Sequence, residues 1–219
     1  MARIPPAVIG IGRNYADHAA EMGGKAPDNL VIFFKNPGSV CSSGDAIVLP
    51  PICDEHGPQV DFEGELAVIL GADCRDVPES QALSKVGGYA AANDVSARWW
   101  QREGSGGQFC RGKSFDTFCP MSQPTPASAV PDPQALRVIT RLNGQVMQDA
   151  PTSLMLHSVA KIIAELSRGT TLLAGTVLLT GTPAGVGFGR TPKVFLQPGD
   201  VVEVEIPGVG HLRNEVRRG

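Results

Sequence analysis

Short apolar runs recur along the chain and are separated by glycine, proline and polar residues. Apolar runs of about four to eight residues bounded by turn residues are typical of buried strands. The pattern predicts such strands at residues 7–12, 30–35, 46–49 and 176–180. Residues 200–206 alternate between valine and acidic positions, which predicts a half-buried strand with Glu203 and Glu205 on its solvated face, and a turn separates it from residues 211–216.

The stretch VDFEGELAVIL at residues 60–70 joins a solid apolar run to a cluster of acids. Asp61, Glu63 and Glu65 occupy alternate positions, and alternate residues of a strand point to the same face. Like charges beside a hydrophobic strand resist desolvation, and a hard divalent cation with oxygen ligands would offset that cost. A solvated edge strand with polar residues on one side fits the same pattern, so these residues alone leave both interpretations open.

Helical patterns are fewer than strand patterns. The strongest covers residues 153–167, with Thr152 or Ser153 as its cap, and shorter helices are predicted at 13–22 and 79–86. Asn143-Gly144 lies between two alternating segments, which predicts a hairpin with a type I′ turn over residues 136–149. The predicted fold class is therefore α+β, strand-rich, with few short helices.

Polar residues gather after a further predicted strand. Residues 89–95 read as this strand, which follows the helix-breaking Gly87-Gly88 and carries Asp94 at its end. The loop that follows, residues 96–119, is too long for a simple connection, and long loops in compact domains are often functional. Its polar residues include Arg98, Gln101, Arg102, Arg111 and Lys113. An aspartate at the end of a strand is also common in ordinary turns.

A histidine and a glutamate share one face of the first predicted helix. His18 and Glu21 are spaced i, i+3, which brings their side chains together on a helix. A carboxylate beside an imidazole raises its basicity and fixes its tautomer, as a general base requires. An exposed histidine–glutamate pair on a surface helix has the same spacing, so the pair by itself does not establish a catalytic role.

Composition narrows the function class. The 219 residues suffice for one domain with a substantial core, and we expect a single domain over 1–219. A net charge of -3 and a pI of about 5.8 argue against nucleic-acid binding. No apolar run reaches the roughly 20 residues of a membrane span, and the first residues are too short and proline-interrupted for a signal peptide, so we expect a cytoplasmic protein without membrane contact.

Cysteine and glycine motifs exclude further classes. The five cysteines are odd in number and lack CxxC spacing, which favours free thiols over a zinc site or a disulfide framework. Gly10-Ile-Gly12 begins like a dinucleotide fingerprint, but Tyr15 occupies the third glycine position. The glycine-rich segment 181–189 lacks the Gly-Lys-Ser/Thr of a phosphate loop.

The order of several motifs resembles the fumarylacetoacetate hydrolase family in its short form, over nearly the whole chain. The motifs that carry the resemblance are GRNYADHAAEM (12–22), FFKNP (33–37), DFEGELAVILG (61–71), GGYAAANDVSAR (87–98), GKSFDTFCP (112–120) and LLTGTPAGVG (178–187). The resemblance implies a mixed β-roll with a pseudo-barrel core, a homodimer, and a site for Mg²⁺ or Mn²⁺.

The resemblance also implies roles for individual residues. The family's metal ligands match Glu63, Glu65 and Asp94, and its catalytic residues match His18, Glu21 and Lys113. Its substrate-binding positions match Arg98, Gln101 and Thr182, and less closely Arg13 and Lys35. One departure is Trp99-Trp100, where many relatives carry an acidic residue directly after the arginine. Two aromatic residues there are expected to narrow the pocket or to pack at a dimer interface.

The implied activity is metal-dependent hydrolysis of a C–C bond in an acylpyruvate-type 1,3-dicarbonyl acid such as fumarylpyruvate, through a metal-stabilised enolate. The expected partner is thus a small 2-keto acid. The same metal and enolate also suit decarboxylation or keto–enol isomerisation of oxaloacetate or a 2-hydroxy-diene-dioate. A non-catalytic metal- or ligand-binding relative is a third hypothesis, because one fold hosts many functions.

Overall fold

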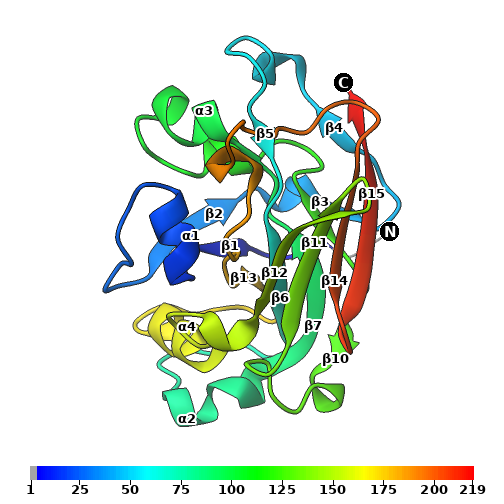
Figure 1. Cartoon of the computed structure of the whole chain (residues 1–219). Coiled ribbons are helices and arrows are strands. Elements are labelled where there is room, and N and C mark those ends of the chain that lie inside the picture. The colour runs from blue at the N-terminus through cyan, green and yellow to red at the C-terminus, as the bar shows by residue number, and fades with distance from the viewer. Residues whose placement is uncertain (1–3) are drawn as a thin grey trace.

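The computed structural model describes residues 4–219 and consists mainly of two mixed β-sheets with a few short helices (Figure 1). The larger, eight-stranded sheet has the order β2-β1-β13-β6-β7-β9-β3, with β10 also paired to β7. Its strands are β1 (Val8–Gly12), β2 (Val31–Lys35), β3 (Val40–Ser42), β6 (Gly64–Leu70), β7 (Val86–Asn93), β9 (Cys119–Met121), β10 (Thr125–Pro126) and β13 (Val177–Leu179).

The second sheet has five strands in the order β12-β11-β14-β15-β4. They are β4 (Ile47–Leu49), β11 (Arg137–Leu142), β12 (Gln145–Pro151), β14 (Val201–Ile206) and β15 (Gly210–Arg218). Side chains of β6, β7, β11, β14 and β15 share the largest hydrophobic core, which is closed by α4 (Val159–Ser167). The predicted strand-rich α+β fold with a curled mixed sheet is therefore confirmed.

The predicted hairpin is confirmed in detail. β11 and β12 pair in antiparallel register, and the two turn residues Asn143 and Gly144 have φ values of 51° and 78°. Positive φ at both central positions is the mark of a type I′ turn. On β14, Glu203 and Glu205 are half-buried and alternate with buried valines, as predicted for a strand with one solvated face.

The helices are shorter than the sequence pattern predicts. The predicted helix 153–167 begins only at Val159, where the Ser158 hydroxyl caps the backbone N–H of Lys161 at 3.1 Å. Thr152 does not cap it, because its hydroxyl bonds to the backbone of Leu136. The other helices are α1 (Ala16–Glu21), α2 (Glu79–Ala82) and α3 (Arg98–Gln101). Among residues 4–219, no helix has the length and apolarity needed to span a membrane.

The predicted central strand at 60–70 is divided into β5 (Val60–Asp61) and β6. β5 pairs with β8 (Ser96–Ala97), whereas β6 lies inside the large sheet between β13 and β7. β7 begins at Val86, before the predicted start at residue 89. At Gly87 the strand passes close to the backbone of Gly71, and an added Cβ would lie 2.8 Å from the Gly71 Cα. This close approach requires glycine, which explains why a residue that usually interrupts a strand lies within this one.

The register of β6 and β7 positions the polar residues that the sequence singled out. Gly64 pairs with Asn93, which places Glu63 and Glu65 beside the end of β7 and Asp94. The backbone N–H of Asp94 donates to the carbonyl of Glu63 at 2.8 Å, and the Asn93 side chain accepts from the Glu63 N–H at 2.9 Å. The acids at residues 63, 65 and 94 are therefore held together by the sheet itself.

Gly64 provides a test of this arrangement. A Cβ at Gly64 would lie 1.9 Å from the buried hydroxyl of Thr140, so Gly64→Ala is expected to lower stability by about 1–3 kcal/mol through overpacking. The double variant Gly64→Ala/Thr140→Ala should recover much of that loss. Chemical denaturation measures both. Gly38→Ala, whose added Cβ meets nothing closer than 3.4 Å, is the control, and equal effects of the two glycine variants would contradict the packing account.

Candidate active site

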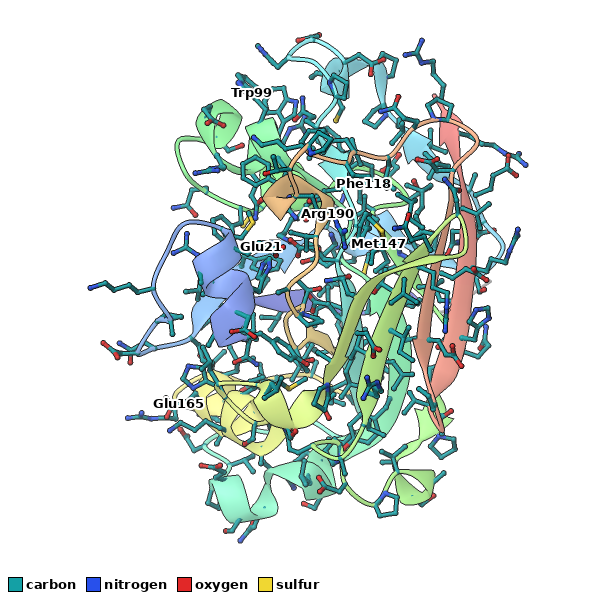
Figure 2. All side chains as sticks on the ribbon, in the orientation of Figure 1. Glu21, Trp99, Phe118, Met147, Glu165 and Arg190 are labelled. Carbon is teal, nitrogen blue, oxygen red and sulfur yellow. The ribbon has the colours of Figure 1, made fainter. Side chains whose placement is uncertain are left out.

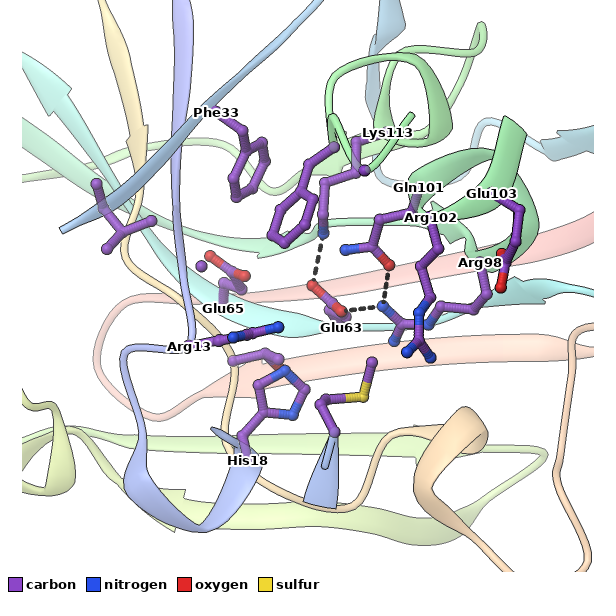
Figure 3. Close-up of a pocket in the computed structure, with 16 residues that line it drawn as sticks. Arg13, His18, Phe33, Glu63, Glu65, Arg98, Gln101, Arg102, Glu103 and Lys113 are labelled. Carbon is purple, nitrogen blue, oxygen red and sulfur yellow. Dashed lines mark hydrogen bonds and ion pairs between the residues drawn. The ribbon is translucent and has the colours of Figure 1, made fainter. Parts of the chain in front are cut away.

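A cavity of about 330 Å³ opens between α1, the first residues of β6 and the segment around α3 (Figure 3). Most of the residues predicted to bind substrate or to take part in catalysis line this cavity, and they come from segments far apart in the sequence. The imidazole of His18 and the ammonium of Lys113 approach the Glu63 carboxylate from opposite sides. The predicted site residues that line the cavity are Arg13, His18, Glu63, Glu65, Arg98, Gln101, Lys113 and Thr182.

The three acids predicted as metal ligands lie together. One carboxylate oxygen from each of Glu63, Glu65 and Asp94 lies within 4.8 Å of the other two, and all three side chains are buried. This excludes a solvated edge strand for the 60–70 segment, because β6 is an interior strand. Asp94 lies beneath the cavity and not on its lining, so it would complete the site from below.

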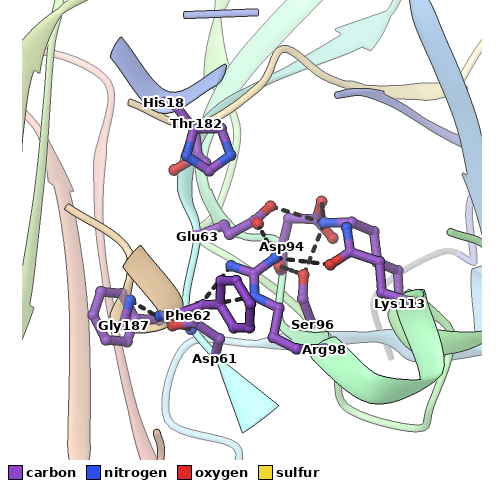
Figure 4. A network of polar contacts seen from close by, with 12 residues as sticks. His18, Asp61, Phe62, Glu63, Asp94, Ser96, Arg98, Lys113, Thr182 and Gly187 are labelled. Atoms are coloured by element: carbon purple, nitrogen blue, oxygen red, sulfur yellow. Dashed lines mark hydrogen bonds and ion pairs between the residues drawn. The ribbon is translucent and has the colours of Figure 1, made fainter. Parts of the chain in front are cut away.

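Two lysines compensate part of this negative charge, and Figure 4 shows one of them, Lys113, beside Glu63 and Asp94. The Lys113 ammonium donates to the carboxylates of Glu63, at 2.8 Å, and Asp94, and to the hydroxyl of Ser96 at 2.8 Å. The Lys35 ammonium donates to the other oxygen of Asp94 at 2.6 Å. Lys35 does not line the cavity, so its predicted contact with substrate is not supported. Its ammonium instead holds Asp94 in place from behind.

Asp61, the first acid of the alternating set, has a different partner. Its Oδ2 accepts from Nε and Nη2 of Arg98 at 2.9 and 2.6 Å. The same carboxylate also accepts the backbone N–H groups of Gly187 and Phe188 at 2.8 and 2.9 Å. Asp61 therefore ties Arg98 and the segment around residue 187 to β5. Arg98 uses its remaining Nη1 to donate to Glu63 Oε1 at 2.6 Å and Gln101 Oε1 at 3.0 Å.

The buried network is short of positive charge. Its four carboxylates, Asp61, Glu63, Glu65 and Asp94, face three cations, Lys35, Arg98 and Lys113. Across residues 4–219, no basic side chain forms an ion pair with Glu65, whose carboxylate accepts only the Gly181 N–H at 2.7 Å. Burial and the nearby charges of Asp94 and Glu63 hold the pKa of Glu65 well above its usual range.

The pKa values of Glu63 and Lys113 are shifted in the directions that favour their charged forms. Burial alone would raise the pKa of Glu63, but Lys113 and Arg98 outweigh it and bring that pKa below its usual range. Burial opposes the charge on Lys113, yet Asp94 and Glu63 raise the pKa of its ammonium. Glu65 is consequently the least compensated of the four acids, and it is the position where added positive charge would be most favourable.

The donor set fits a hard divalent cation. Bonds from such a small cation to oxygen are about 2.1 Å long, so neighbouring ligands of an octahedral cation lie about 3.0 Å apart and opposite ligands about 4.2 Å apart. The three carboxylate oxygens, grouped within 4.8 Å, are close enough for their side chains to move to such a spacing around one cation. The nearby thiol of Cys119 does not compete, since burial raises its pKa to about 12. Consistent with the prediction, all five cysteines are free.

His18 lies in the cavity wall and not on an exposed surface, and Glu21 lies beside it outside the lining. His18 Nδ1 is 3.3 Å from Glu21 Oε2, and His18 is only 5 % exposed. Both Glu21 oxygens accept the backbone N–H of Gly185, at 3.0 and 3.2 Å. An added Cβ at Gly189 would lie 2.1 Å from the Glu21 Cγ, so the glycine-rich segment closes tightly over this carboxylate. Glu21 is thus fixed beside the imidazole.

Thr182 is oriented by a residue that sequence reasoning missed. The Thr182 hydroxyl donates to the Gly64 carbonyl at 2.9 Å and accepts from Gln148 Nε2 at 2.7 Å. Gln148 Oε1 in turn accepts the Gly64 N–H at 2.9 Å. No local signal marks Gln148, because it belongs to an ordinary hairpin strand and reaches the site only through contact between the two sheets.

Neither Trp99 nor Trp100 lines the cavity, so of the two expected roles the narrowing of the pocket is not supported. Packing at a dimer interface stays a prediction. Trp99 lies at the edge of the molecule (Figure 2) and stacks on His56 with ring centroids 3.5 Å apart. Trp100 packs edge-on against Trp99 and Phe115, with Arg111 over its face at 5.5 Å. Both indoles point away from the cavity because α3 turns Arg98 and Gln101 toward it.

The fold and the site define a strand-rich α+β domain in which three buried acids and a histidine–glutamate pair lie around one cavity. The family model for the fumarylacetoacetate (FAA) hydrolase C-terminal domain matches residues 7–217. The chain therefore belongs to the fumarylacetoacetate hydrolase family. Members of this family are enzymes and include hydrolases and isomerases.

Three proteins similar to this chain are named for three different activities, those of an isomerase, a hydrolase and a tautomerase. The 5-carboxymethyl-2-hydroxymuconate delta-isomerase of Mycobacterium smegmatis is 41% identical, with a TM-score of 0.85 over 99% of this chain and 80% of that one. Fumarylpyruvate hydrolase of Pseudomonas aeruginosa, solved with Mn²⁺ and pyruvate, is 30% identical, with a TM-score of 0.86 over 98% and 91%. The mitochondrial oxaloacetate tautomerase Fahd2a of Rattus norvegicus is 40% identical over 97% of this chain and 66% of its own.

The charge deficit at Glu65 leads to a stability prediction. A raised pKa means that folding opposes ionisation of Glu65, so the metal-free protein should lose stability as pH rises above the ordinary glutamate pKa of about 4.3. Glu65→Gln, which keeps an acceptor for the Gly181 N–H, removes this penalty. We expect it to stabilise the metal-free protein by about 1 kcal/mol or more at pH 8, a rise in Tm of about 2–4 °C per kcal/mol.

Thermal unfolding in a chelator between pH 5 and pH 9 measures this effect. The matched control is Glu215→Gln on the exposed face of β15, which should change stability by less than about 0.5 kcal/mol. A Glu65→Gln variant that is less stable than the wild type at pH 8 would show that the carboxylate is well compensated without a metal.

Proposed function

We propose that the chain hydrolyses the C–C bond of an acylpyruvate, a 2,4-dioxo acid such as fumarylpyruvate. The observation that carries the proposal is that His18, which lines the cavity together with Glu63 and Glu65, is paired with Glu21 at 3.3 Å. A metal site alone suits many reactions of 2-oxo acids. A buried imidazole held by a fixed carboxylate adds what hydrolysis needs, a general base for water.

The reaction adds one water across one carbon–carbon bond. Hydroxide from water bonds to the C4 carbonyl carbon, and the C3–C4 bond then breaks, with its electron pair forming the enolate of pyruvate. A proton adds to C3 of that enolate. The products are the carboxylic acid of the acyl group and pyruvate, so no oxidant, reductant or second substrate is required.

Glu63, Glu65 and Asp94 would hold one Mg²⁺ or Mn²⁺ in this proposal. When bound, such a cation supplies Lewis-acid stabilisation for negative charge on the oxygens of a 2-oxo acid. Glu65 has no cationic partner among residues 4–219, so it gains most from this charge. The solved relative from Pseudomonas aeruginosa, which contains Mn²⁺ and pyruvate, supports the choice of cation and of product.

The protein's own residues perform the proton transfer and orient the substrate. His18 takes a proton from water, and Glu21 keeps the imidazole in one tautomer and stabilises its cationic form. Lys113, held charged by Glu63 and Asp94, stabilises negative charge on the reacting oxygen or on the substrate carboxylate. The remaining predicted binding residues that line the cavity, Arg13, Arg98, Gln101 and Thr182, orient the acid.

The role of His18 is testable by substitution. His18→Ala should lower kcat for acylpyruvate hydrolysis by about 10²–10⁴-fold, the usual contribution of a general base. Glu21→Gln should cause a smaller loss and move the pH profile, because the amide cannot stabilise the imidazolium. His211→Ala, an exposed residue on β15, is the control. Hydrolysis that survives in His18→Ala within about threefold would contradict the proposal.

Keto–enol isomerisation or decarboxylation of oxaloacetate is the second candidate function. The observation that favours it is the 40% identity to a protein named as an oxaloacetate tautomerase. Both reactions use the same acids for the cation but need no attacking water. Assaying the wild type and His18→Ala with acylpyruvate and oxaloacetate separates the two. Turnover of oxaloacetate alone by the wild type would favour the second function, and retained oxaloacetate turnover in His18→Ala would confine the histidine to hydrolysis.

A further inference from the structure

Two arginines line the cavity without a carboxylate partner. Arg98 and Lys113, the other basic residues of the lining besides His18, already form ion pairs with the buried acids. Arg13 and Arg102 form no ion pair within residues 4–219. A guanidinium that faces a ligand cavity without an internal partner is available for an anion.

Arg102 has a defined position at the cavity mouth. It directly follows α3, and its guanidinium lies over the ring of Phe188 with its carbon 5.3 Å from the ring centroid. Arg98 approaches the same ring at 6.0 Å. Since the backbone of Phe188 and the guanidinium of Arg98 are both bound to Asp61, the surface that supports Arg102 is fixed relative to the buried acids.

Positive charge gathers around the ring of Phe188. The ammonium of Lys193 also lies over Phe188, 3.9 Å from its centroid, and forms no ion pair among the described residues. Glu103 is the one acid of the lining outside the buried network, and it too has no ion pair within residues 4–219. Lys193 itself is outside the cavity lining. Within the lining, Arg13 and Arg102 against Glu103 leave an excess of positive charge away from the acidic floor of Glu63 and Glu65.

The wall between floor and mouth is apolar. Phe33 and Phe109 pack with ring centroids 5.9 Å apart, and Ile11 and Met22 complete this side. At about 330 Å³ the cavity is at the small end of ligand pockets, which are about 300–1,000 Å³. It therefore suits a short acyl chain with polar groups at both ends better than a long alkyl or aromatic tail.

We infer that Arg102 binds a second carboxylate at the distal end of the substrate, so that the preferred acid is dicarboxylic. This inference rests on the proposed function for the position of the 2-oxo acid end at the acidic floor. The acyl chain lies along Phe33 and Phe109, and its terminal carboxylate meets the guanidinium of Arg102. Trp99 and Trp100 take no part in this selection, because both pack away from the cavity.

Two substrates of the same reaction test the inference, namely fumarylpyruvate, with a distal carboxylate, and acetylpyruvate, with a distal methyl group. Arg102→Ala should lower kcat/KM for fumarylpyruvate by about 10–100-fold, the loss expected for one charge-assisted contact, and change acetylpyruvate by less than about threefold. Arg102→Glu should lower fumarylpyruvate turnover further. The control is Arg168→Ala, an exposed arginine next to α4. Equal losses for both substrates would overturn the inference.

A binding measurement keeps this inference separate from the proposed function. Calorimetry with the Mn²⁺-loaded protein compares 2-oxoadipate with 2-oxohexanoate, which have equal chain length and differ in the distal carboxylate. The wild type should bind 2-oxoadipate more tightly, and Arg102→Ala should remove that preference. If no acylpyruvate is turned over but this preference holds, the proposed function fails and the anion site stands. If both acids bind equally to the wild type, the anion site is refuted whatever the turnover.

Discussion

The buried pairing of four carboxylates with three cations is the interaction on which the rest of this structure depends. Isolated charges are strongly disfavoured inside a protein, and a buried acid persists only with compensating partners. Asp61, Glu63 and Asp94 have such partners in Arg98, Lys113 and Lys35. Glu65 does not, and its raised pKa is the consequence. A divalent cation bound by the acids would remove this deficit, so the same imbalance that weakens the metal-free protein favours metal binding.

The register of the large sheet brings this network together. An interior strand normally carries apolar side chains on both faces, yet β6 begins with Gly64 between two glutamates. Gly64 allows Thr140 of the second sheet to approach, while Gln148 and Thr182 bind its backbone. Both sheets thus contact the segment that carries the acids, which lies on an interior strand.

Much of this arrangement was predictable from the sequence, and the exceptions have physical reasons. The strands and the Asn143-Gly144 hairpin follow from local periodicity and turn residues. The set Glu63, Glu65 and Asp94 follows from the order of motifs that the chain shares with its family. Gln148 and the anchoring role of Asp61 depend on contacts between distant segments, which no local pattern encodes. The helix begins at Val159 and not near residue 153 because Ser158 caps it, while the Thr152 hydroxyl is bonded to the backbone of the distant Leu136, a contact that no local pattern encodes.

The central claim is that Glu63, Glu65 and Asp94 together hold one divalent cation facing a 2-oxo acid. Anomalous X-ray diffraction from crystals grown with Mn²⁺ and pyruvate tests it most directly. The account predicts one strong Mn²⁺ peak per chain, with an oxygen of each acid about 2.1–2.2 Å from it and pyruvate beside it in the cavity. A Mn²⁺ peak only at other residues, or none while pyruvate is bound, would contradict it.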